Sequence, residues 1–382
     1  MSNTRSDKTA ILMYANPEID ADMLYFGKFL APDPFMAVGL GRRRIGILSP
    51  LELGRASKQS GFTDILSLTD VRSSAKRELG VDNPKTSDIA RFIAQSYGIG
   101  TYKVPHNFPH AIAQELVDAG VKVVLGTDPF FPEREKKTDA EAEAIREGNR
   151  LSSAGFKLVQ KVLKESEINK KGFLIYGGKK LTSEFLQQEI AKRILELGGV
   201  SANTIVAGGD QACDPHERGS GPLKANELII VDIFPRVNAT HFHGDMTRTY
   251  LKGKASPEQK RLVAAVKAAH GKALDLVKAR VKGGQIHKAV SDYFEENGYK
   301  TERHGDTFTG FFHGTGHGLG LDVHEAPRVS TGAGALKAGN VVTIEPGLYY
   351  PGLGGCRIED VVRVTGNGYE MLSKHSYTWE IK

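Results

Sequence analysis

Five residues that can bind metal ions follow one another through the second half of this 382-residue chain. Hard oxygen donors favour Mn²⁺, Co²⁺, Zn²⁺ or Fe²⁺ in sites with five or six ligands, and a bridging carboxylate can hold two such ions close together. A structural zinc site would favour Cys and His instead. The set therefore predicts a hydrolytic site with two metal ions. Its members are Asp232, Asp245, His317, Glu345 and Glu359.

The first two acids belong to a predicted hairpin. Residues 228–233 form an apolar run of strand type that contains Asp232, and strand character returns in residues 241–251 around Asp245. Because an even number of residues separates the two acids, we expect them to lie directly opposite each other, with the turn near Asn238 and Ala239. The segment is equally compatible with an edge hairpin that carries two exposed acids.

The segment from His313 to Glu325 has three histidines among four glycines. Glycines let a backbone approach a ligand closely, so the pattern is typical of the wall of a site. A His-rich surface loop is the alternative, but three imidazoles with this much glycine favour a metal or substrate role. The order of strand, glycine-rich turn and helix that marks a nucleotide-binding loop is missing.

Two further strands carry the last acids. Residues 341–344 form an apolar run that ends at Glu345 and a Pro-Gly turn, and residues 354–362 begin a strand in which Arg357 and Glu359 alternate onto one face. A cation beside anionic ligands forms either a simple salt bridge or a contact to a substrate carbonyl or carboxylate.

Together these motifs resemble the metallopeptidases of the pita-bread fold, which comprise Xaa-Pro aminopeptidases, Xaa-Pro dipeptidases (prolidases) and methionine aminopeptidases. The resemblance covers roughly residues 138–382. It implies that the five residues above are dinuclear ligands, that Asp245 and Glu359 bridge both ions, and that Glu345 is also the general base. Mn²⁺ is the expected metal, with Co²⁺ or Zn²⁺ as alternatives.

The resemblance also implies residues that contact the substrate. His313 and His324 resemble the two imidazoles that hold the scissile carbonyl and stabilise the intermediate, and His216 resembles a further substrate-facing histidine of the proline-specific branch. Arg357 matches the arginine of the family's Arg-Ile-Glu-Asp strand. Hydroxyls near the acids are expected to orient the carboxylates. These hydroxyls are Thr247 and Thr343.

One departure from the family pattern concerns the predicted hairpin. Twelve residues separate Asp232 from Asp245, two more than is usual in that family, and Ile233-Phe234-Pro235-Arg236 replaces the usual glycine after the first acid. Lengthening each arm by one residue keeps the acids opposed, so the site survives this change. Substrate preference near the turn is left open.

The N-terminal third reads as a separate α/β domain, which we place at residues 1–137. Strand patterns at residues 10–14, 45–48, 65–68 and 121–125 alternate with helical patterns at 86–95 and 111–119. Thr138-Asp139-Ala140-Glu141 has the form of a capping box and opens a helix through about Leu163. An α+β pita-bread catalytic domain is expected at residues 138–382, with helices near 183–197, 257–281 and 286–297.

The hydropathy, the cysteine content and the net charge of the chain favour a soluble enzyme. No segment is long and apolar enough for a membrane span or a signal peptide, and only Cys213 and Cys356 are present, which favours a reducing cytoplasm. The net charge of +6 comes from 51 basic and 45 acidic residues and favours solubility over nucleic-acid binding. Arg42-Arg43-Arg44 is interpreted as a solvated strand entry. The resemblance implies a homodimer.

We therefore expect a metal-dependent exopeptidase that acts on peptides with proline at the second position. A creatinase-like N-terminal domain, loosely matched by residues 25–34, is absent from methionine aminopeptidases and favours the Xaa-Pro branch. An Xaa-Pro aminopeptidase is preferred, and an Xaa-Pro dipeptidase is the alternative. A metal-free hydrolase of the creatinase type and a non-catalytic pita-bread binding protein both predict lost ligands, whereas all five are present.

Overall fold

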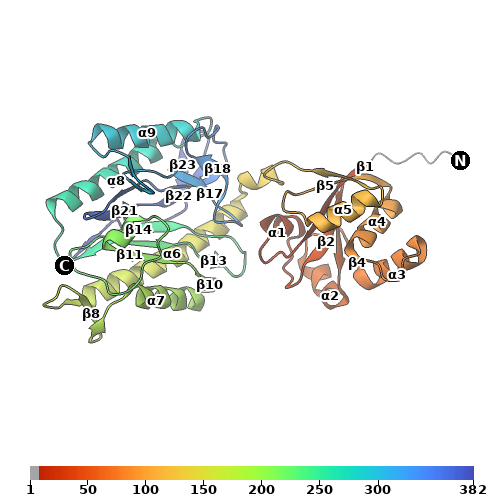
Figure 1. The fold of residues 1–382 in the computed structure, drawn as a ribbon, viewed down its shortest axis with the longest axis horizontal. Coiled ribbons are helices and arrows are strands. Elements are labelled where there is room, and N and C mark those ends of the chain that lie inside the picture. The colour runs from red at the N-terminus through yellow and green to blue at the C-terminus, as the bar shows by residue number, and fades with distance from the viewer. Residues whose placement is uncertain (1–7) are drawn as a thin grey trace. The chain divides into compact units, whose positions relative to one another are not determined.

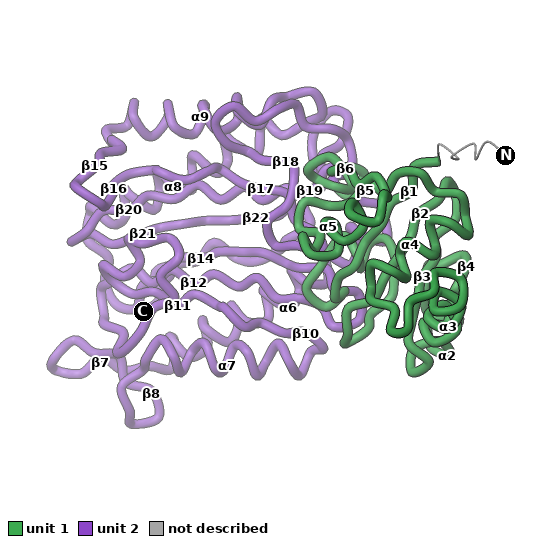
Figure 2. Tube along the Cα trace, turned by 45° about the vertical axis from the view of Figure 1, so that its right-hand side comes forward, with its two compact units in different colours: residues 1–134 green, residues 135–382 purple. Residues whose placement is uncertain are grey.

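The computed structural model describes residues 8–382, and the chain divides into two compact units, Met1–Arg134 and Glu135–Lys382 (Figure 2). The boundary expected after residue 137 falls close to this division. Both units combine helices with sheets (Figure 1). Within residues 8–382, every helix is too short or too polar to cross a bilayer.

The first unit is built on a six-stranded sheet with the order β4-β3-β2-β1-β5-β6. Only β2 is antiparallel to its neighbours. The four expected strands correspond to β1, β3, β4 and β6, and the structure adds β2 and β5, whose apolar patterns Gly39 and Gly100 interrupt. The strands are β1 (Lys8–Ala15), β2 (Phe35–Leu40), β3 (Arg43–Leu48), β4 (Asp64–Ser67), β5 (Ile99–Val104) and β6 (Lys122–Leu125).

Helices pack on this sheet through apolar faces. The expected helices at residues 86–95 and 111–119 correspond to α4 and α5, and Ile89 and Ile93 of α4 are buried in the core beside Tyr102 of β5. The helices are α1 (Ala21–Gly27), α2 (Pro50–Gln59), α3 (Leu68–Leu79), α4 (Thr86–Tyr97) and α5 (His110–Asp118), followed by a 3₁₀ turn, η1 (Pro132–Glu135).

The second unit places two main sheets between two pairs of helices (Figure 1). Helices α6 and α7 pack on the sheet β11-β12-β14-β24, and helices α8 and α9 pack on the sheet β18-β17-β19-β22-β23. The strands of these sheets are β11 (Ile205–Gly208), β12 (Ile229–Ile233), β14 (Met246–Lys252), β24 (Glu380–Ile381), β17 (Gly316–Gly318), β18 (Glu325–Val329), β19 (Val341–Ile344), β22 (Asp360–Val364) and β23 (Tyr369–Met371).

Shorter strands and a 3₁₀ turn complete the second unit. The pair β20-β21 follows β19 and carries the Pro-Gly turn and the Arg357 strand. These elements are β7 (Glu167–Ile168), β8 (Leu174–Tyr176), β9 (Lys179–Lys180), β10 (Gly199–Val200), β13 (Arg236–Val237), β15 (Glu302–His304), β16 (Thr307–Thr309), β20 (Gly347–Tyr350), β21 (Gly354–Arg357) and η2 (Gly209–Cys213).

The expected helices of this unit are present. The capping box at the start of α6 is formed, since the Thr138 amide donates to the Glu141 carboxylate at 2.8 Å and the Glu141 amide donates back to the Thr138 hydroxyl at 3.3 Å. Helix α8 ends earlier than expected because the Ala279 and Arg280 amides donate to carbonyls of other segments. The helices are α6 (Asp139–Glu165), α7 (Ser183–Glu196), α8 (Pro257–Leu276) and α9 (Gly283–Glu296).

The register of the predicted hairpin was wrong, although its turn near Asn238 is confirmed. Asp232 on β12 lies opposite Thr247 on β14, and Asp245 precedes the first paired residue of β14. The Asp245 amide instead donates to the Asn149 side chain of α6 at 2.9 Å, which takes this residue out of the ladder. Since Asp245 and Thr247 are two residues apart, both acids still share one face.

Candidate metal centre and substrate cleft

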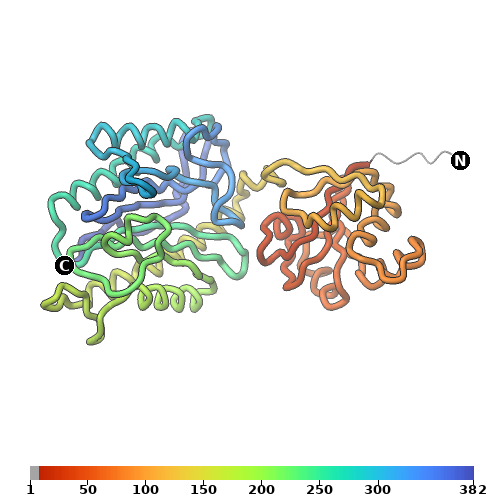
Figure 3. Tube along the Cα trace, in the orientation of Figure 1, coloured from red at the N-terminus to blue at the C-terminus, as the bar shows by residue number. Residues whose placement is uncertain are grey.

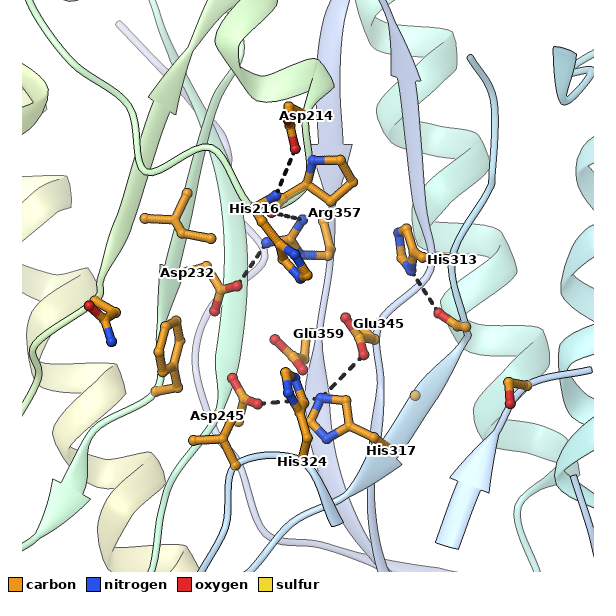
Figure 4. A pocket seen from close by; sticks show the side chains of 18 of the residues that line it. Asp214, His216, Asp232, Asp245, His313, His317, His324, Glu345, Arg357 and Glu359 are labelled. Atoms are coloured by element: carbon orange, nitrogen blue, oxygen red, sulfur yellow. Dashed lines mark hydrogen bonds and ion pairs between the residues drawn. The ribbon is translucent and has the colours of Figure 1, made fainter. Parts of the chain in front are cut away.

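A cavity of about 870 Å³ in the second unit is lined by side chains from both main sheets. Figure 4 shows carboxylates and imidazoles from these strands pointing into one space. Every residue that the sequence suggested as a ligand or substrate contact lines it. These residues are Asp232, Asp245, His317, Glu345, Glu359, His216, His313, His324 and Arg357.

The two aspartates come from the sheet that α6 covers. Asp232 sits on β12 among fully buried apolar residues, and Arg357 donates to its Oδ2 at 2.7 Å. Its other oxygen, Oδ1, is buried and has no hydrogen-bond partner. Such an orphan is rare in a folded protein and indicates a ligand at this position. The Asp245 carboxylate lies 3.6 Å from His317 Nε2.

His317 and Glu345 come from the other sheet. The His317 ring donates from Nδ1 to the Gly318 carbonyl at 3.1 Å, and burial lowers its pKa to about 4, so Nε2 is left with a free lone pair. Nε2 lies 3.4 Å from Glu345 Oε1. The Thr343 hydroxyl accepts from the His317 amide at 3.1 Å and lies 3.4 Å from the same Glu345 oxygen. Thr343 thus contacts both residues, as expected for an orienting hydroxyl.

Glu359 lies between β21 and β22, and its carboxylate accepts from the Thr247 hydroxyl at 2.8 Å. Thr247 in turn accepts from Arg357 Nε at 3.2 Å. Donor atoms of Asp245, His317 and Glu359 all lie within 4.8 Å of one another, an arrangement that can hold a metal ion.

The cluster concentrates buried negative charge. Burial, and then the charges of neighbouring acids, raise the pKa of Asp245 and of Glu359 well above the usual range. Burial raises the pKa of Glu345 to about 7, although Arg357 opposes the rise. Without a cation these acids share protons, and a divalent ion would replace those protons. The buried acids, the neutral imidazole and the orphaned Asp232 oxygen fit a divalent metal site.

A second set of side chains forms a hydrogen-bonded chain along the cleft. Arg357 Nη1 donates to the Tyr349 hydroxyl at 3.0 Å, and that hydroxyl lies 2.8 Å from His313 Nε2. His313 Nδ1 donates to the Gly314 carbonyl at 2.7 Å, so the neutral ring accepts from Tyr349. Burial, assisted by Arg357, lowers the pKa of His313 to about 3. Donation from His313 to a substrate therefore requires a second proton on its ring.

Two other histidines border the cleft. The His324 ring stands perpendicular to the His317 ring with centroids 4.3 Å apart, and burial lowers its pKa to about 4. His216 is exposed beside Asp214, whose carboxylate accepts from the His216 amide at 3.2 Å. Figure 4 shows His324 beside the acids and His216 beside Arg357, so the two imidazoles border different parts of the cleft.

Three residues of the site were missed by sequence reasoning. Tyr349 is fully buried and links Arg357 to His313; a tyrosine two residues after a Pro-Gly turn was the available signal. Asn149 belongs to α6 and fixes the Asp245 backbone, a contact between residues far apart in sequence that no local pattern reveals. Arg328 on β18 lines the cleft and follows the His-rich segment closely.

Comparison with known proteins identifies the family. A model of metallopeptidase family M24 matches residues 143–366. The chain belongs to this family. An uncharacterized peptidase of Staphylococcus haemolyticus is 34% identical over 244 residues, which are 63% of each chain. The Xaa-Pro dipeptidase of Pyrococcus furiosus is 33% identical over 196 residues, and these cover 49% of this chain and only 53% of that protein.

Solved structures share the fold over nearly the whole chain. An X-Pro aminopeptidase from Thermotoga maritima superimposes with a TM-score of 0.80 at 22% identity and covers 98% of both chains. An Xaa-Pro dipeptidase from Bacillus anthracis also gives 0.80 at 22% identity, covering 98% of this chain and 95% of the other. The expected fold class, an α/β N-terminal part followed by a pita-bread part, is confirmed.

Proposed function

We propose that this M24 protein is a dinuclear metal-dependent exopeptidase that hydrolyses Xaa-Pro bonds, most readily as an Xaa-Pro aminopeptidase. The observation that carries the proposal is the convergence of four carboxylates and one imidazole in a single cleft, with one buried Asp232 oxygen left without a partner. The ligands would be Asp232, Asp245, His317, Glu345 and Glu359, with Asp245 and Glu359 shared between two ions. Mn²⁺ is the preferred metal, and Co²⁺ or Zn²⁺ would suit the same donors.

Divalent ions bound here would supply an activated water and a polarised substrate carbonyl. Glu345, whose pKa near 7 in the free protein suits proton transfer, would take the proton from the attacking water and pass it to the leaving nitrogen. His324 and His313 would stabilise the negative charge of the intermediate. The developing charge favours a second proton on His313, because an imidazolium beside an anion is stabilised.

Arg357 and the two threonines would keep the acids in place. Arg357 holds one oxygen of Asp232 and leaves the other free, while Thr247 and Thr343 orient Glu359 and Glu345. His216, which lies beside Arg357 in Figure 4, would contact the substrate beyond the reacting bond. A creatinase-type reaction without metal, or a role in binding alone, would leave the buried acid cluster unexplained.

A second candidate is an Xaa-Pro dipeptidase. Arg328 places a cation at the wall of the cleft, and a free carboxylate directly after proline would be attracted to it. The relative from Pyrococcus horikoshii, 28% identical over 78% of this chain and 80% of its own length, carries the name Xaa-Pro dipeptidase. The two candidates differ in whether peptides longer than two residues are cleaved.

The test is hydrolysis by metal-stripped protein reloaded separately with Mn²⁺, Co²⁺ and Zn²⁺. Xaa-Pro, Xaa-Pro-Yaa-Zaa and the control peptide Met-Ala-Ser would be compared, each with wild type and with Arg328→Gln. Metal-dependent cleavage of the longer proline peptides supports the aminopeptidase. Cleavage confined to dipeptides, weakened by Arg328→Gln, supports the dipeptidase. Tight metal binding with no cleavage of any proline peptide would contradict both.

Domain roles, compartment and assembly belong to the same proposal. We infer a creatinase-like domain at residues 1–137, a catalytic domain at residues 138–382, and a cytoplasmic homodimer. The cysteines Cys213 and Cys356 are both free, as a reducing compartment would require. Light scattering on the purified chain measures the assembly, and a monomeric mass at micromolar concentration would contradict the dimer.

A further inference from the structure

A buried ion pair lies behind the cleft, between the residues that follow Thr247 and Glu359 in sequence. Arg248 Nη2 donates to Asp360 Oδ1 at 2.8 Å, and both side chains are almost completely buried. Adjacent residues in extended chain face opposite sides, and Glu359 lines the cleft whereas Arg248 and Asp360 do not, so the ion pair points away from it.

Arg248 ties together the two backbone segments that carry Thr247 and Glu359. Its Nη1 donates to the Thr247 carbonyl at 2.9 Å and to the Glu359 carbonyl at 2.6 Å. The Glu359 amide also donates to the Thr247 carbonyl at 3.1 Å. The planar guanidinium therefore fixes the relative position of two residues whose side chains meet in the cleft, where Thr247 donates to Glu359 at 2.8 Å.

Asp360 is held from the other side by the C-terminal segment, residues 372–382. The Ser373 hydroxyl donates to Asp360 Oδ1 at 2.7 Å, and the Tyr377 hydroxyl donates to Oδ2 at 2.6 Å. The Tyr377 ring also lies 4.6 Å from the Arg248 guanidinium. Figure 3 shows the chain ending at the left edge of the second unit, and β24 of this segment pairs with β14.

The same segment completes the hydrogen bonds of Arg248. Nε donates to the Ser376 carbonyl at 3.3 Å, and Nη2 donates to the His375 carbonyl at 3.4 Å. All the acceptors of this buried cation are thus carbonyls of the cleft strands, carbonyls of the C-terminal segment, or Asp360. A buried ion pair often stabilises a fold no more than well-packed apolar side chains do, and a role in fixing geometry is the hypothesis that these contacts motivate.

We propose that Arg248, Asp360 and Tyr377 are positioning residues that hold the Glu359 carboxylate at the place where it binds metal. This inference rests on the proposed function, because it takes Glu359 as a shared metal ligand. The residues touch neither substrate nor metal; they act on Glu359 through its carbonyl and through the adjacent residue. Loss of one such outer contact typically weakens metal binding about 10- to 100-fold.

The test compares two conservative variants, Tyr377→Phe and Arg248→Lys, with a matched control. Tyr102→Phe likewise removes one tyrosine hydroxyl that donates a hydrogen bond, here from a fully buried ring to the Ala90 carbonyl at 2.8 Å in the first unit. Titration calorimetry with Mn²⁺ gives the dissociation constants and the stoichiometry, and thermal denaturation of the metal-free proteins gives the loss of stability. We expect at least about tenfold weaker binding in Arg248→Lys, a smaller loss of affinity in Tyr377→Phe, and unchanged affinity in Tyr102→Phe.

The outcomes separate positioning from simple stabilisation. If Tyr377→Phe and Arg248→Lys lower the melting temperature as Tyr102→Phe does but leave the Mn²⁺ affinity within about twofold of wild type, the positioning role is wrong. If wild-type protein binds no Mn²⁺, Co²⁺ or Zn²⁺, the proposed metal centre is refuted. The positioning role is then refuted as well, because it depends on that centre. If metal affinity falls in Arg248→Lys and Tyr377→Phe but not in Tyr102→Phe, the role is supported even where no peptide is cleaved.

Discussion

At the scale of single residues, the cleft holds more negative charge than the surrounding protein neutralises. Asp245, Glu345 and Glu359 are buried together, and the one guanidinium that counters their pKa shifts is that of Arg357. Buried like charges are unfavourable unless protons or a cation accompany them. The metal-free protein therefore retains protons in the cleft, and metal binding exchanges those protons for ions.

Metal binding is expected to release protons near neutral pH. Glu345 has a pKa of about 7 in the folded, metal-free protein, above its ordinary value of 4.5, so protonation stabilises the folded state at low pH. That stability is lost as the pH rises from about 4.5 through 7, and the contribution of Glu345 to proton release on metal binding declines above this range. Titration calorimetry in buffers of different ionisation enthalpy measures the release; identical heats in all buffers at pH 6 would contradict it.

Replacement of Glu345 by glutamine is expected to abolish turnover without unfolding the protein. Glutamine keeps the size of the side chain but cannot accept a proton, and loss of a general base typically lowers the rate about 10²- to 10⁴-fold. Steady-state kinetics on Xaa-Pro peptides and circular dichroism measure the two effects. Glu217→Gln, which changes an exposed acid outside the cluster, serves as the control. Near-normal turnover in Glu345→Gln would refute the role.

At the scale of elements, helix α6 determines where Asp245 lies. The Asn149 side chain accepts from the Asp245 amide. The preceding helix residue, Gly148, lies against the backbone of Gly244 in the loop before Asp245. A Cβ added to Gly148 would lie 2.3 Å from the Gly244 nitrogen, so neither glycine can carry a side chain. Helix and loop are therefore in direct backbone contact beside a proposed metal ligand.

Gly148→Ala should destabilise the protein, although alanine normally favours a helix. The clash with Gly244 requires backbone movement, which costs about 1–3 kcal/mol and displaces Asp245. Gly271→Ala in α8 is the matched control, because a Cβ there meets no atom within 4 Å; it should stabilise by up to ~1 kcal/mol. Urea denaturation and Mn²⁺ titration of both variants measure the effects. Equal stabilisation by the two changes would show that the contact is unimportant.

Local sequence patterns predicted most helices and strands of the second unit. They failed where contacts between residues far apart in sequence determine the structure. The Thr138 capping box and the strand before Glu345 follow from neighbouring residues, so sequence reasoning found them. The single strand expected at residues 354–362 was wrong, because the chain leaves the pair β20-β21 after Arg357 and joins the other sheet at Asp360. The pairing of Asp232 with Asp245 was predicted from spacing and was wrong, because Asn149, far away in sequence, takes the Asp245 amide out of the ladder. Tyr349 was missed for the same reason: its partners come together only in the folded chain.

At the scale of the whole molecule, the candidate site belongs entirely to the second unit. Every residue that lines the cleft lies between Asn203 and Glu359. The first unit has its own six-stranded sheet and its own core. Ligand binding stabilises the part of a protein that folds around the ligand. Metal should therefore act on the stability of one unit and leave that of the other largely unchanged.

Calorimetric unfolding should show a metal-sensitive transition and a metal-insensitive one. At a metal concentration 100 times the dissociation constant, binding adds about 2.7 kcal/mol per site to the stability of the second unit. Scanning calorimetry of metal-free and Mn²⁺-loaded protein measures both transitions, and Asp245→Ala, which should no longer bind metal, is the control. Equal shifts of both transitions, or a shift that persists in Asp245→Ala, would contradict the expectation.

The order of the metal-binding residues along the chain also determines when the metal centre can form during synthesis. Asp232 and Asp245 belong to the sheet under α6, whereas Glu359 adjoins β22 of the other sheet and is the last of the five to be synthesised. A chain still growing on the ribosome therefore lacks one shared ligand until three of the five strands of that second sheet have been made. Metal capture is expected to be a late event in biosynthesis, and a chain interrupted before residue 359 has an incomplete metal centre.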